Sequence, residues 1–288
     1  MAIELGIIGF PIGHSLSPVF QQAALDHIGI DATYSTWEIR EENLNTFIDG
    51  LRLPSIQGIN VTVPHKESVL PLLDHVDEWA QQAGAVNTIV NRNGILYGYN
   101  TDGIGFIKGL RHNQPFDLQG KTVLIIGAGG SARGVVRALA NESVGDIIIA
   151  NRTLSRAQSL STLSMGLGVS ARAISLDWQE LSLAAVKSEL VVNCTSVGMA
   201  HTSEFGLSPL LLQQISPNSV VYDLVYNPIE TQLLKEAAQA GAAVISGIKM
   251  LVYQGAASFE LWFDRPAPVD VMLESADKAI QDMAQNLD

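Results

Sequence analysis

The sequence is poor in cysteine and in charge. It has one cysteine, Cys194, in 288 residues, and only 16% of its residues are charged. A single cysteine cannot form an internal disulfide, which indicates a reducing compartment. The charged fraction lies below the quarter that is typical of soluble domains. Because hydrophobic residues make up 47% of the chain, a packed core can form and a disordered chain is excluded.

Basic residues and long apolar runs are also scarce. The chain has 17 Lys and Arg against 29 Asp and Glu, a formal net charge of −12, which excludes a general nucleic-acid binder. No apolar run approaches the roughly 18 residues of a membrane span, and residues 1–4 lack the basic start of a signal peptide. We therefore expect a cytoplasmic monomer or homodimer whose partner is neither nucleic acid nor a membrane.

Metal-ligand patterns are missing as well. The chain has six histidines, but no His-x-x-x-His pair and no zinc signature, so we expect no metal. Charge is spread unevenly: residues 1–101 hold 11 acids and 4 bases, whereas residues 121–156 hold 5 bases and 2 acids. This positive segment in an acidic chain is where an anionic ligand is expected, although charge alone favours a solvated helix face.

Short β-branched runs alternate with segments of helical period, which predicts an α/β fold with mainly parallel sheets. Between two such runs, Asn93-Gly94 predicts a hairpin and an antiparallel edge. The predicted strands are Ile3–Ile8, Thr33–Glu38, Ile56–Val61, Ala85–Asn91, Thr122–Ile126, Asp146–Ala150, Ala171–Ile174, Glu189–Asn193, Val220–Asp223 and Ala243–Ile245. The predicted helices include Pro18–His27, Glu41–Leu51, Lys66–Leu73, Ile104–Arg111, Arg133–Ala140, Lys249–Phe263 and Val269–Leu287.

The length suggests two domains, and the best boundary candidate is the polar segment at residues 100–103, just before a predicted helix. Residues 1–101 and 102–247 then form two α/β domains. The C-terminal helices, within residues 248–288, follow the last predicted strand and can pack back on the first domain.

A glycine-rich turn, Gly127-Ala128-Gly129-Gly130-Ser131-Ala132, joins a predicted strand to a predicted helix, which is the context of a dinucleotide-binding turn. Gly127 permits the tight turn, Gly129 lets a pyrophosphate approach the backbone, and Ala132 packs the helix on the sheet. The helix N-terminus adds N–H groups for the phosphates. This pattern predicts a Rossmann-type domain. The alternative is a glycine-rich loop that binds no ligand.

The residues after the next strand indicate which dinucleotide binds. An NAD-type site places an Asp or Glu there to accept from the ribose hydroxyls, whereas this chain has Asn151 and Arg152, with Arg156 one helical turn later. Two arginines attract a 2′-phosphate that a carboxylate would repel. The sequence therefore favours NADP, against the alternative of two surface arginines that begin a helix.

Three polar segments lie in the first domain, at residues 9–18, 60–66 and 85–102. In the first, Ser15 and Ser17 can present two hydroxyls to a small carboxylate, although Ser17 can instead cap a helix. The second joins a strand end, a turn and a predicted helix start, which is where open α/β sheets bind ligands. Lys66 in the second segment and Asp102 in the third are candidate functional groups. The alternatives are that Lys66 is a solvated surface lysine and that Asp102 only caps a helix.

These segments carry a resemblance to a known family. In chain order they read Gly-x-Pro-Ile-x-His-Ser-x-Ser-Pro, Asn-Val-Thr-x-Pro-x-Lys, Gly-Ala-Val-Asn-Thr, Asn-Thr-Asp-Gly, Gly-Ala-Gly-Gly-x-Ala, Asn-Arg-Thr-x-x-Arg-Ala and Met-Leu-Val-x-Gln-Gly-Ala. Through these motifs the chain closely resembles the shikimate dehydrogenase family over its whole length. The resemblance implies a substrate-binding α/β domain, a Rossmann-type NADP-binding domain and an active site in the cleft between them. It also implies reversible NADPH-dependent reduction of 3-dehydroshikimate to shikimate, in the shikimate pathway to chorismate and aromatic amino acids.

The resemblance implies roles for individual residues. Lys66 and Asp102 match the catalytic pair of the family, and Ser15 and Ser17 match the residues that hold the substrate carboxylate. The other substrate-binding candidates are Asn60, Thr62, Asn87, Thr101, Tyr226 and Gln254. The cofactor-binding candidates are Glu78, Gly127, Ala128, Gly129, Gly130, Ser131, Asn151, Arg152, Thr153, Leu154, Ser155, Arg156, Leu224 and Gly247.

The chemistry leaves alternatives open. Oxidation of an alcohol needs a group that takes the hydroxyl proton, and Lys66 is the candidate base. A neighbouring Asp102 carboxylate favours the ammonium form, whereas a base has to be neutral. Either a desolvated site restores the neutral amine, or the pair passes the proton onward. Other functions also stay open: a quinate/shikimate dehydrogenase that uses NAD or both cofactors, and a catalytically silent sensor of a dinucleotide and a small acid.

Overall fold

The computed structural model describes residues 3–113, 115–200 and 202–285. Residues 1–2, part of the segment that lacks a signal peptide pattern, lie outside the described residues, as do Asn286 and Leu287 of the last predicted helix. The chain forms two compact units. Residues 1–105 with 251–288 form unit 1, and residues 106–250 form unit 2. The chain passes from one unit to the other within α4 (Asp102–Leu110) and returns within α9 (Ile248–Phe263).

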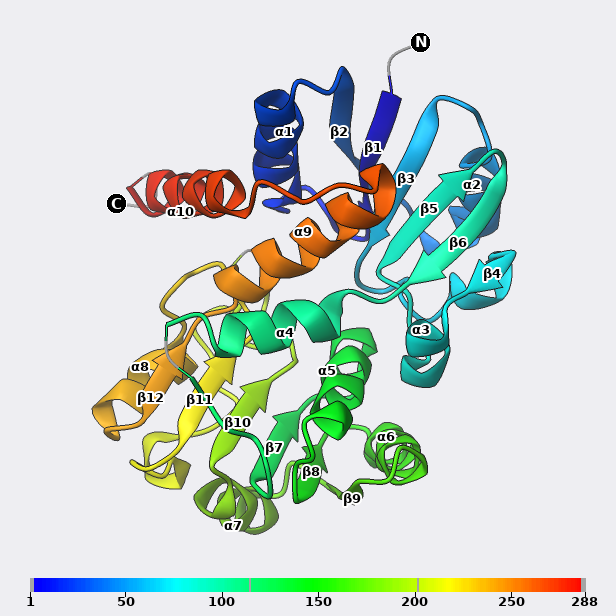
Figure 1. Cartoon of the computed structure of the whole chain (residues 1–288). Coiled ribbons are helices and arrows are strands. Elements are labelled where there is room, and N and C mark those ends of the chain that lie inside the picture. Colours follow the sequence, from blue (N-terminus) through cyan, green and yellow to red (C-terminus); the bar gives the residue numbers. More distant parts are fainter. Residues whose placement is uncertain (1–2, 114, 201, 286–288) are drawn as a thin grey trace. The chain divides into compact units, whose positions relative to one another are not determined.

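Unit 1 contains a sheet in the order β2-β1-β3-β5-β6-β4 (Figure 1). Its elements before α4 are β1 (Ile3–Gly9), α1 (Ser17–Ile28), β2 (Ala32–Glu38), η1 (Glu41–Asn43), α2 (Leu44–Gly50), β3 (Ile56–Val61), η2 (Leu70–Leu72), β4 (His75–Val76), α3 (Glu78–Ala83), β5 (Thr88–Arg92) and β6 (Ile95–Tyr99). Strand β1 pairs in parallel with β2 and β3, as β4 does with β6. Strand β5 runs antiparallel to both β3 and β6.

The β5–β6 hairpin brings distant segments to one edge of this sheet. Its turn has φ values of 55° at Asn93 and 85° at Gly94, the left-handed values of the predicted two-residue turn. Because β5 is antiparallel to its neighbours, Thr88 at its start pairs with Asn60 of β3 and with Tyr99 of β6. The segments that follow β3 and β6 therefore lie beside the segment that precedes β5.

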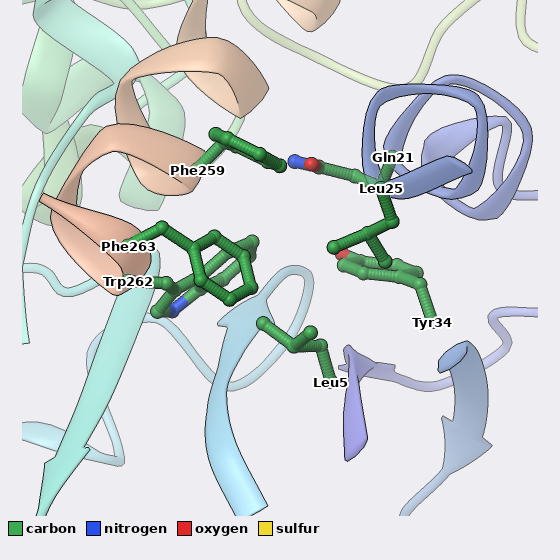
Figure 2. A pocket seen from close by; sticks show the side chains of 7 residues that line it. All are labelled: Leu5, Gln21, Leu25, Tyr34, Phe259, Trp262 and Phe263. Carbon is green, nitrogen blue, oxygen red and sulfur yellow. The ribbon is translucent and has the colours of Figure 1, made fainter. Parts of the chain in front are cut away.

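Helices and turns cover both faces of the unit 1 sheet. On one face, buried residues of the strands pack against α2 and α3, in a cluster that includes Ile8, Ile48 and Ala80. On the other face, side chains from β1, β2, α1 and α9 converge, as Figure 2 shows. Gly255 permits this close packing of α9, because a Cβ there would lie 2.5 Å from the ring of Phe20 in α1.

The predicted helix Lys66–Leu73 is wrong. Residues 63–69 form turns, and only η2 is helical, with three residues. Pro71 explains the difference, because it has no N–H to donate within a helix and disfavours the helical conformation of the residue before it. Strand β5 begins at Thr88 rather than at the predicted Ala85, whose N–H donates back to the Ala80 carbonyl of α3. The short elements β4 and α3 were not predicted.

Unit 2 contains a sheet in the order β12-β11-β10-β7-β8-β9, with every pairing parallel. Its elements after α4 are β7 (Thr122–Ile126), α5 (Gly130–Asn141), β8 (Asp146–Ala150), α6 (Leu154–Gly166), β9 (Ser170–Ile174), α7 (Trp178–Lys187), β10 (Leu190–Asn193), η3 (Leu212–Gln214), β11 (Val220–Asp223), α8 (Gln232–Gln239) and β12 (Ala243–Ile245). The strand order reverses at β7, which is the order of a Rossmann fold. The predicted α/β class with a Rossmann-type sheet is confirmed.

The unit 2 strands are buried on both faces, which explains their continuous apolar runs. Leu124 and Ile126 of β7 belong to the cluster that packs against α7 and α8. Val123 and Ile125 alternate with them, point to the opposite face and are fully buried. This layering places the carboxyl end of β7 at the centre of the sheet, where the glycine-rich turn follows.

The last helix, α10 (Val269–Gln285), packs against α1 within unit 1. The predicted C-terminal helices are therefore confirmed as far as Gln285. Within the described ranges, we find no helix with the length and apolarity that a membrane crossing requires.

Asp223 at the end of β11 is a buried carboxyl group in unit 2. Its oxygens accept hydrogen bonds from the Asn193 amide (2.9 Å), the Val225 N–H (3.0 Å) and the Thr231 hydroxyl (2.6 Å). Burial nevertheless raises the pKa of Asp223 to about 6, because loss of water penalises the charged form more than these bonds favour it.

We expect Asp223→Asn to remove a pH dependence of stability. The raised pKa means that the folded protein holds this proton more tightly than the unfolded chain, whose aspartate has a pKa near 3.8. The resulting stabilisation is complete below that value and is lost as the pH rises through about 6. From about pH 5 to about pH 7.5, the wild-type free energy of unfolding should fall by about 1.5 kcal/mol relative to the variant. Urea unfolding at both pH values measures this difference, and parallel pH dependence in the two proteins would contradict it.

Candidate active site

Lys66 and Asp102 form a buried ion pair in unit 1. Lys66 Nζ lies 2.5 Å from Asp102 Oδ2, and the two side chains are 9% and 4% exposed. Lys66 belongs to the turns after β3, and its carbonyl accepts from the Val86 N–H at 2.8 Å, just before β5. Asp102 is the first residue of α4. The interpretation of Lys66 as a solvated surface lysine is therefore wrong.

Two asparagines hold Asp102 in place. The Asn87 amide donates to Asp102 Oδ1 at 2.9 Å, so both carboxylate oxygens have partners. The side-chain oxygen of Asn100 accepts from the Asp102 N–H at 3.0 Å, and its amide donates to the Ala85 carbonyl at 2.9 Å. Asn100 thus satisfies the start of α4, while the Asp102 carboxylate points to Lys66 and Asn87.

Asn87 has a defined amide orientation. Its Oδ1 accepts from the Thr101 N–H at 2.8 Å, so its Nδ2 must face the other way. That nitrogen lies 2.9 Å from Asp102 Oδ1 and 3.1 Å from Gln254 Oε1. Asn87, Thr101 and Asp102 are all buried, and Gln254 comes from α9. Four of the predicted site residues are therefore brought together here.

Asn60 links this group to α1. Its Oδ1 accepts from the Tyr34 hydroxyl at 2.7 Å, and its Nδ2 donates to Ser258 Oγ at 2.9 Å. Burial raises the pKa of Tyr34, and a hydrogen bond with the Ser17 side chain opposes the rise. Ser15 Oγ in turn accepts from the Ser17 N–H at 3.2 Å.

The structure corrects the interpretation of Ser17 as a helix cap. Leu16 is the cap position of α1, and Ser17 is the first helical residue, with its side chain turned to Tyr34. The half-buried Thr62 directly follows β3, and its N–H donates to the Ile8 carbonyl at 2.9 Å. Tyr226 follows β11 and is the one substrate candidate that belongs to unit 2.

Four buried polar residues of the cluster were not predicted, namely Tyr34, Thr88, Asn100 and Ser258. Two of them had a usable signal: Asn100 precedes a predicted helix as a cap should, and Ser258 lies four residues after Gln254, on the same helix face. Thr88 and Asn100 also belong to the third polar segment of the sequence. Tyr34 lies within a strand, where nothing in the local pattern separates it from core residues. The part of the chain described here contains no group of three or more His, Cys, Asp or Glu that could hold a metal ion.

In unit 2 the glycine-rich turn follows β7 as predicted. Gly127 has φ of 110°, and a Cβ there would lie 3.1 Å from the Cys194 carbonyl group, so the position requires glycine. At Gly129, the cap position just before α5, a Cβ would meet no atom within 4 Å, so its backbone is open to a ligand. Ala132 is fully buried against the sheet. With Ala128, Gly130 and Ser131 completing the turn, these residues fit a dinucleotide pyrophosphate.

The segment after β8 lies next to that turn, because β8 pairs with β7. The side chain of Asn151 donates to the Thr153 carbonyl at 2.9 Å, and Arg152 to Arg156, including Leu154 and Ser155, are exposed. No residue from 151 to 156 is acidic. Arg152 and Arg156 thus present two exposed guanidinium groups beside the dinucleotide-binding turn, with no carboxylate in the same segment. This arrangement fits the 2′-phosphate of NADP.

The remaining cofactor candidates divide between the units. Leu224 follows β11 and Gly247 follows β12, and they pack together, since a Cβ on Gly247 would lie 2.2 Å from the Leu224 carbonyl oxygen. Glu78 begins α3 in unit 1, is exposed, and accepts from the Gln82 amide at 3.0 Å. It is the one cofactor candidate outside unit 2.

Comparison with known proteins gives three family matches along the chain. Residues 7–89 match the shikimate dehydrogenase substrate binding domain, and residues 110–209 match shikimate / quinate 5-dehydrogenase. Residues 247–276 match the shikimate 5′-dehydrogenase C-terminal domain. The matches thus cover segments of both units.

Whole-length relatives agree with these matches. Shikimate dehydrogenase (NADP(+)) from Methanopyrus kandleri is 44% identical over 94% of this chain and 93% of its own. Shikimate 5-dehydrogenase from Thermus thermophilus, in complex with NADP(H) and shikimate, is 35% identical with a TM-score of 0.85, covering 96% of this chain and 99% of its own. Quinate dehydrogenase from Corynebacterium glutamicum, in complex with NAD, is 31% identical with a TM-score of 0.84, covering 95% and 98%. The chain therefore belongs to the shikimate dehydrogenase family.

Proposed function

We propose that the protein catalyses the reversible NADPH-dependent reduction of 3-dehydroshikimate to shikimate, a step of the shikimate pathway to aromatic amino acids. The observation that carries this proposal is the buried ion pair of Lys66 and Asp102, 2.5 Å apart among uncharged hydrogen-bonding side chains. In this pair Lys66 is a proton donor, and the amide and hydroxyl side chains around it can bind a hydroxylated ring. Its presence also speaks against a catalytically silent sensor.

The polar cluster suits a small ring acid. Ser15 and Ser17 offer hydroxyls for the carboxylate, while Asn60, Asn87 and Gln254 offer amides for ring hydroxyls. These neutral groups avoid placing a second cation beside Lys66. Thr62, Thr101 and, from unit 2, Tyr226 complete the proposed substrate residues. The proposal covers a monomer and a homodimer alike.

Lys66 is the proposed proton donor and acceptor. When bound, NADPH supplies a hydride to the carbonyl carbon of the substrate. Lys66, as an ammonium group, donates a proton to the carbonyl oxygen, which becomes the hydroxyl of shikimate. Asp102 keeps the ammonium group in place through the ion pair and balances its positive charge. In the reverse direction Lys66 receives the hydroxyl proton, either as a neutral amine or by passing a proton through Asp102.

The turn at residues 127–131 and the segment at residues 151–156 are the proposed NADP site, with Leu224 and Gly247 at the nicotinamide. Glu78 is retained as a cofactor residue on the resemblance alone. We place the protein in the cytoplasm as part of this proposal, because its one cysteine forms no internal disulfide and suits a reducing compartment.

An assay matrix tests the proposed function. Shikimate and quinate are each tested with NADP and NAD, and kcat/KM is measured from the absorbance of the reduced cofactor. Shikimate with NADP is expected to give the highest value, about 100-fold above shikimate with NAD, because the arginines bind the 2′-phosphate. A higher value for quinate with NAD would favour the interpretation as a quinate dehydrogenase. No turnover of shikimate with either cofactor would refute the proposed function.

A further inference from the structure

Ser258 lies at the centre of the unit 1 cluster without belonging to the residues expected there. It is carried by α9, one turn after Gln254, and is fully buried. Its hydroxyl lies 2.9 Å from Asn60 Nδ2, 2.7 Å from Thr88 Oγ1 and 3.3 Å from Thr101 Oγ1. It also lies 3.0 Å from the Gln254 carbonyl. One hydroxyl therefore has four polar neighbours, three of them on strands or segments distant in sequence.

The chemistry of these neighbours fixes the direction of some of the hydrogen bonds. A carbonyl-type oxygen can only accept, so Thr88 donates to Asn87 Oδ1 at 3.0 Å, and Ser258 donates to the Gln254 carbonyl. An amide nitrogen can only donate, so Asn60 donates to Ser258. The Ser258 and Thr88 oxygens lie 2.7 Å apart, where either hydroxyl can be the donor.

The result is a continuous chain of hydrogen-bonding groups. It joins the Tyr34 hydroxyl, Asn60, Ser258, Thr88 and Asn87, and ends on Asp102 Oδ1. Neighbouring hydrogen bonds in a buried chain polarise one another, and this one ends on a carboxylate. Ser258 is the link between the half that holds Asn60 and the half that holds Asp102.

The first half of this chain is anchored by packing. Tyr34 projects from β2 among apolar side chains of α1 and α9 (Figure 2). Its ring centroid lies 6.1 Å from that of Trp262. With Tyr34 fixed on one side of the Asn60 amide and Ser258 on the other, the amide has one favoured orientation. Without Ser258, Asn60 Nδ2 has only the more distant Asn87 carbonyl, at 3.2 Å, and Thr88 Oγ1, at 3.3 Å, among the described residues.

We propose that Ser258 is a positioning residue for the substrate site: through its hydroxyl it orients the Asn60 amide and couples it to the Asn87–Asp102 half of the cluster. The inference rests on the proposed function, because it concerns how the same site presents its groups to shikimate. Ser258 acts through Asn60 and Thr88, and its role is the geometry of those groups.

Ser258→Ala tests the inference by steady-state kinetics. We expect kcat/KM for shikimate to fall by about 10-fold, mainly through a higher KM, because one hydrogen bond is lost and a buried N–H is left poorly paired. The KM for NADP should stay within about twofold of the wild type. A purely structural role would lower the unfolding temperature and leave the KM for shikimate unchanged.

Two further variants make the test specific. Ser164→Ala is the matched control, because Ser164 in α6 is fully buried and its hydroxyl has no hydrogen-bond partner among the described residues. It should leave both KM values unchanged. Thr88→Val breaks the next link of the chain at similar size, and should raise the KM for shikimate to the same extent. The double variant Ser258→Ala/Thr88→Val should be no worse than either alone, because the chain is already broken.

The outcomes separate this inference from the proposed function. If the wild type turns over shikimate and Ser258→Ala has a wild-type KM for shikimate, the inference is wrong and the proposed function stands. If Ser258→Ala does not fold, Thr88→Val decides in the same way. If the wild type itself does not turn over shikimate, the proposed function fails and the inference fails with it.

Discussion

Lys66→Ala is expected to lower kcat for shikimate oxidation by about 1,000-fold while changing the KM for shikimate by less than about 10-fold. The reason is that Lys66 moves a proton in the transition state, whereas the ground-state substrate is held mainly by uncharged groups. Steady-state kinetics with saturating NADP measure both constants. Near-normal turnover in this variant would refute the catalytic role of Lys66.

Two other variants separate the proton from the charge. Lys66→Ala leaves the buried Asp102 carboxylate without a cation, and such a loss costs about 3–5 kcal/mol of stability, so unfolding must be measured beside activity. Lys66→Arg keeps the positive charge beside Asp102, but a guanidinium group does not give up its proton near neutral pH. Low turnover in both variants supports proton transfer by Lys66. Lys278→Ala, which removes a lysine from α10 of the same unit, outside the cluster, is the control and should behave as the wild type.

Arg152→Ala is expected to raise the KM for NADP by about 30-fold and to change the KM for NAD by less than about threefold. The reason is that a charge-assisted bond to the 2′-phosphate is available only with NADP. Both constants are measured with saturating shikimate. An equal loss for the two cofactors would rule out a 2′-phosphate role.

The control for Arg152 removes the same charge from elsewhere in unit 2. Lys235 is exposed on α8, which packs on β11 and β12, whereas Arg152 follows β8 toward the other edge of the sheet. Lys235→Ala lowers the net charge equally, so a similar rise in the KM for NADP would indicate a general electrostatic effect rather than a local contact. We expect no such rise.

The dinucleotide site could be predicted from the sequence because its parts are contiguous. Strand, turn and helix follow one another from Thr122 to Asn141, and each residue of the turn is explained by its neighbours. The cofactor preference could be predicted for the same reason. Because β8 is a parallel neighbour of β7, the segment after β8 lies at the same edge of the sheet as the turn, and that segment has no carboxylate. Only the resemblance pointed to Leu224 and Gly247, which meet through the ends of two other strands.

The unit 1 cluster could be predicted only in part, because its contacts join distant segments. Local pattern pointed to Ser15, Ser17 and Lys66, but not to the bond between Asn60 and Ser258, which are 198 residues apart in sequence. The hairpin at Asn93-Gly94 was the useful signal, since it returns the chain to the end of β3. Tyr34 gave no sign of its role, because a buried tyrosine in a strand is ordinary core material.

The wrong helix at residues 66–73 shows the limit of periodicity. Apolar residues recur there at helical spacing, yet Pro71 removes an N–H and interrupts the run. The resulting turns are what bring the Lys66 carbonyl to the Val86 N–H and its side chain to Asp102. A regular helix would have used that carbonyl within itself.

Unit 1 is discontinuous, and this affects how the protein is made. The first 105 residues leave the ribosome well before α9, which carries Gln254 and Ser258. Unit 2 is one continuous segment, so it can complete its fold first, although synthesis usually favours the N-terminal part. Until α9 arrives, the buried amides of Asn60 and Asn87 lack their α9 partners in the nascent chain. The substrate cluster of unit 1 therefore has all of its hydrogen-bond partners only after α9 has been translated.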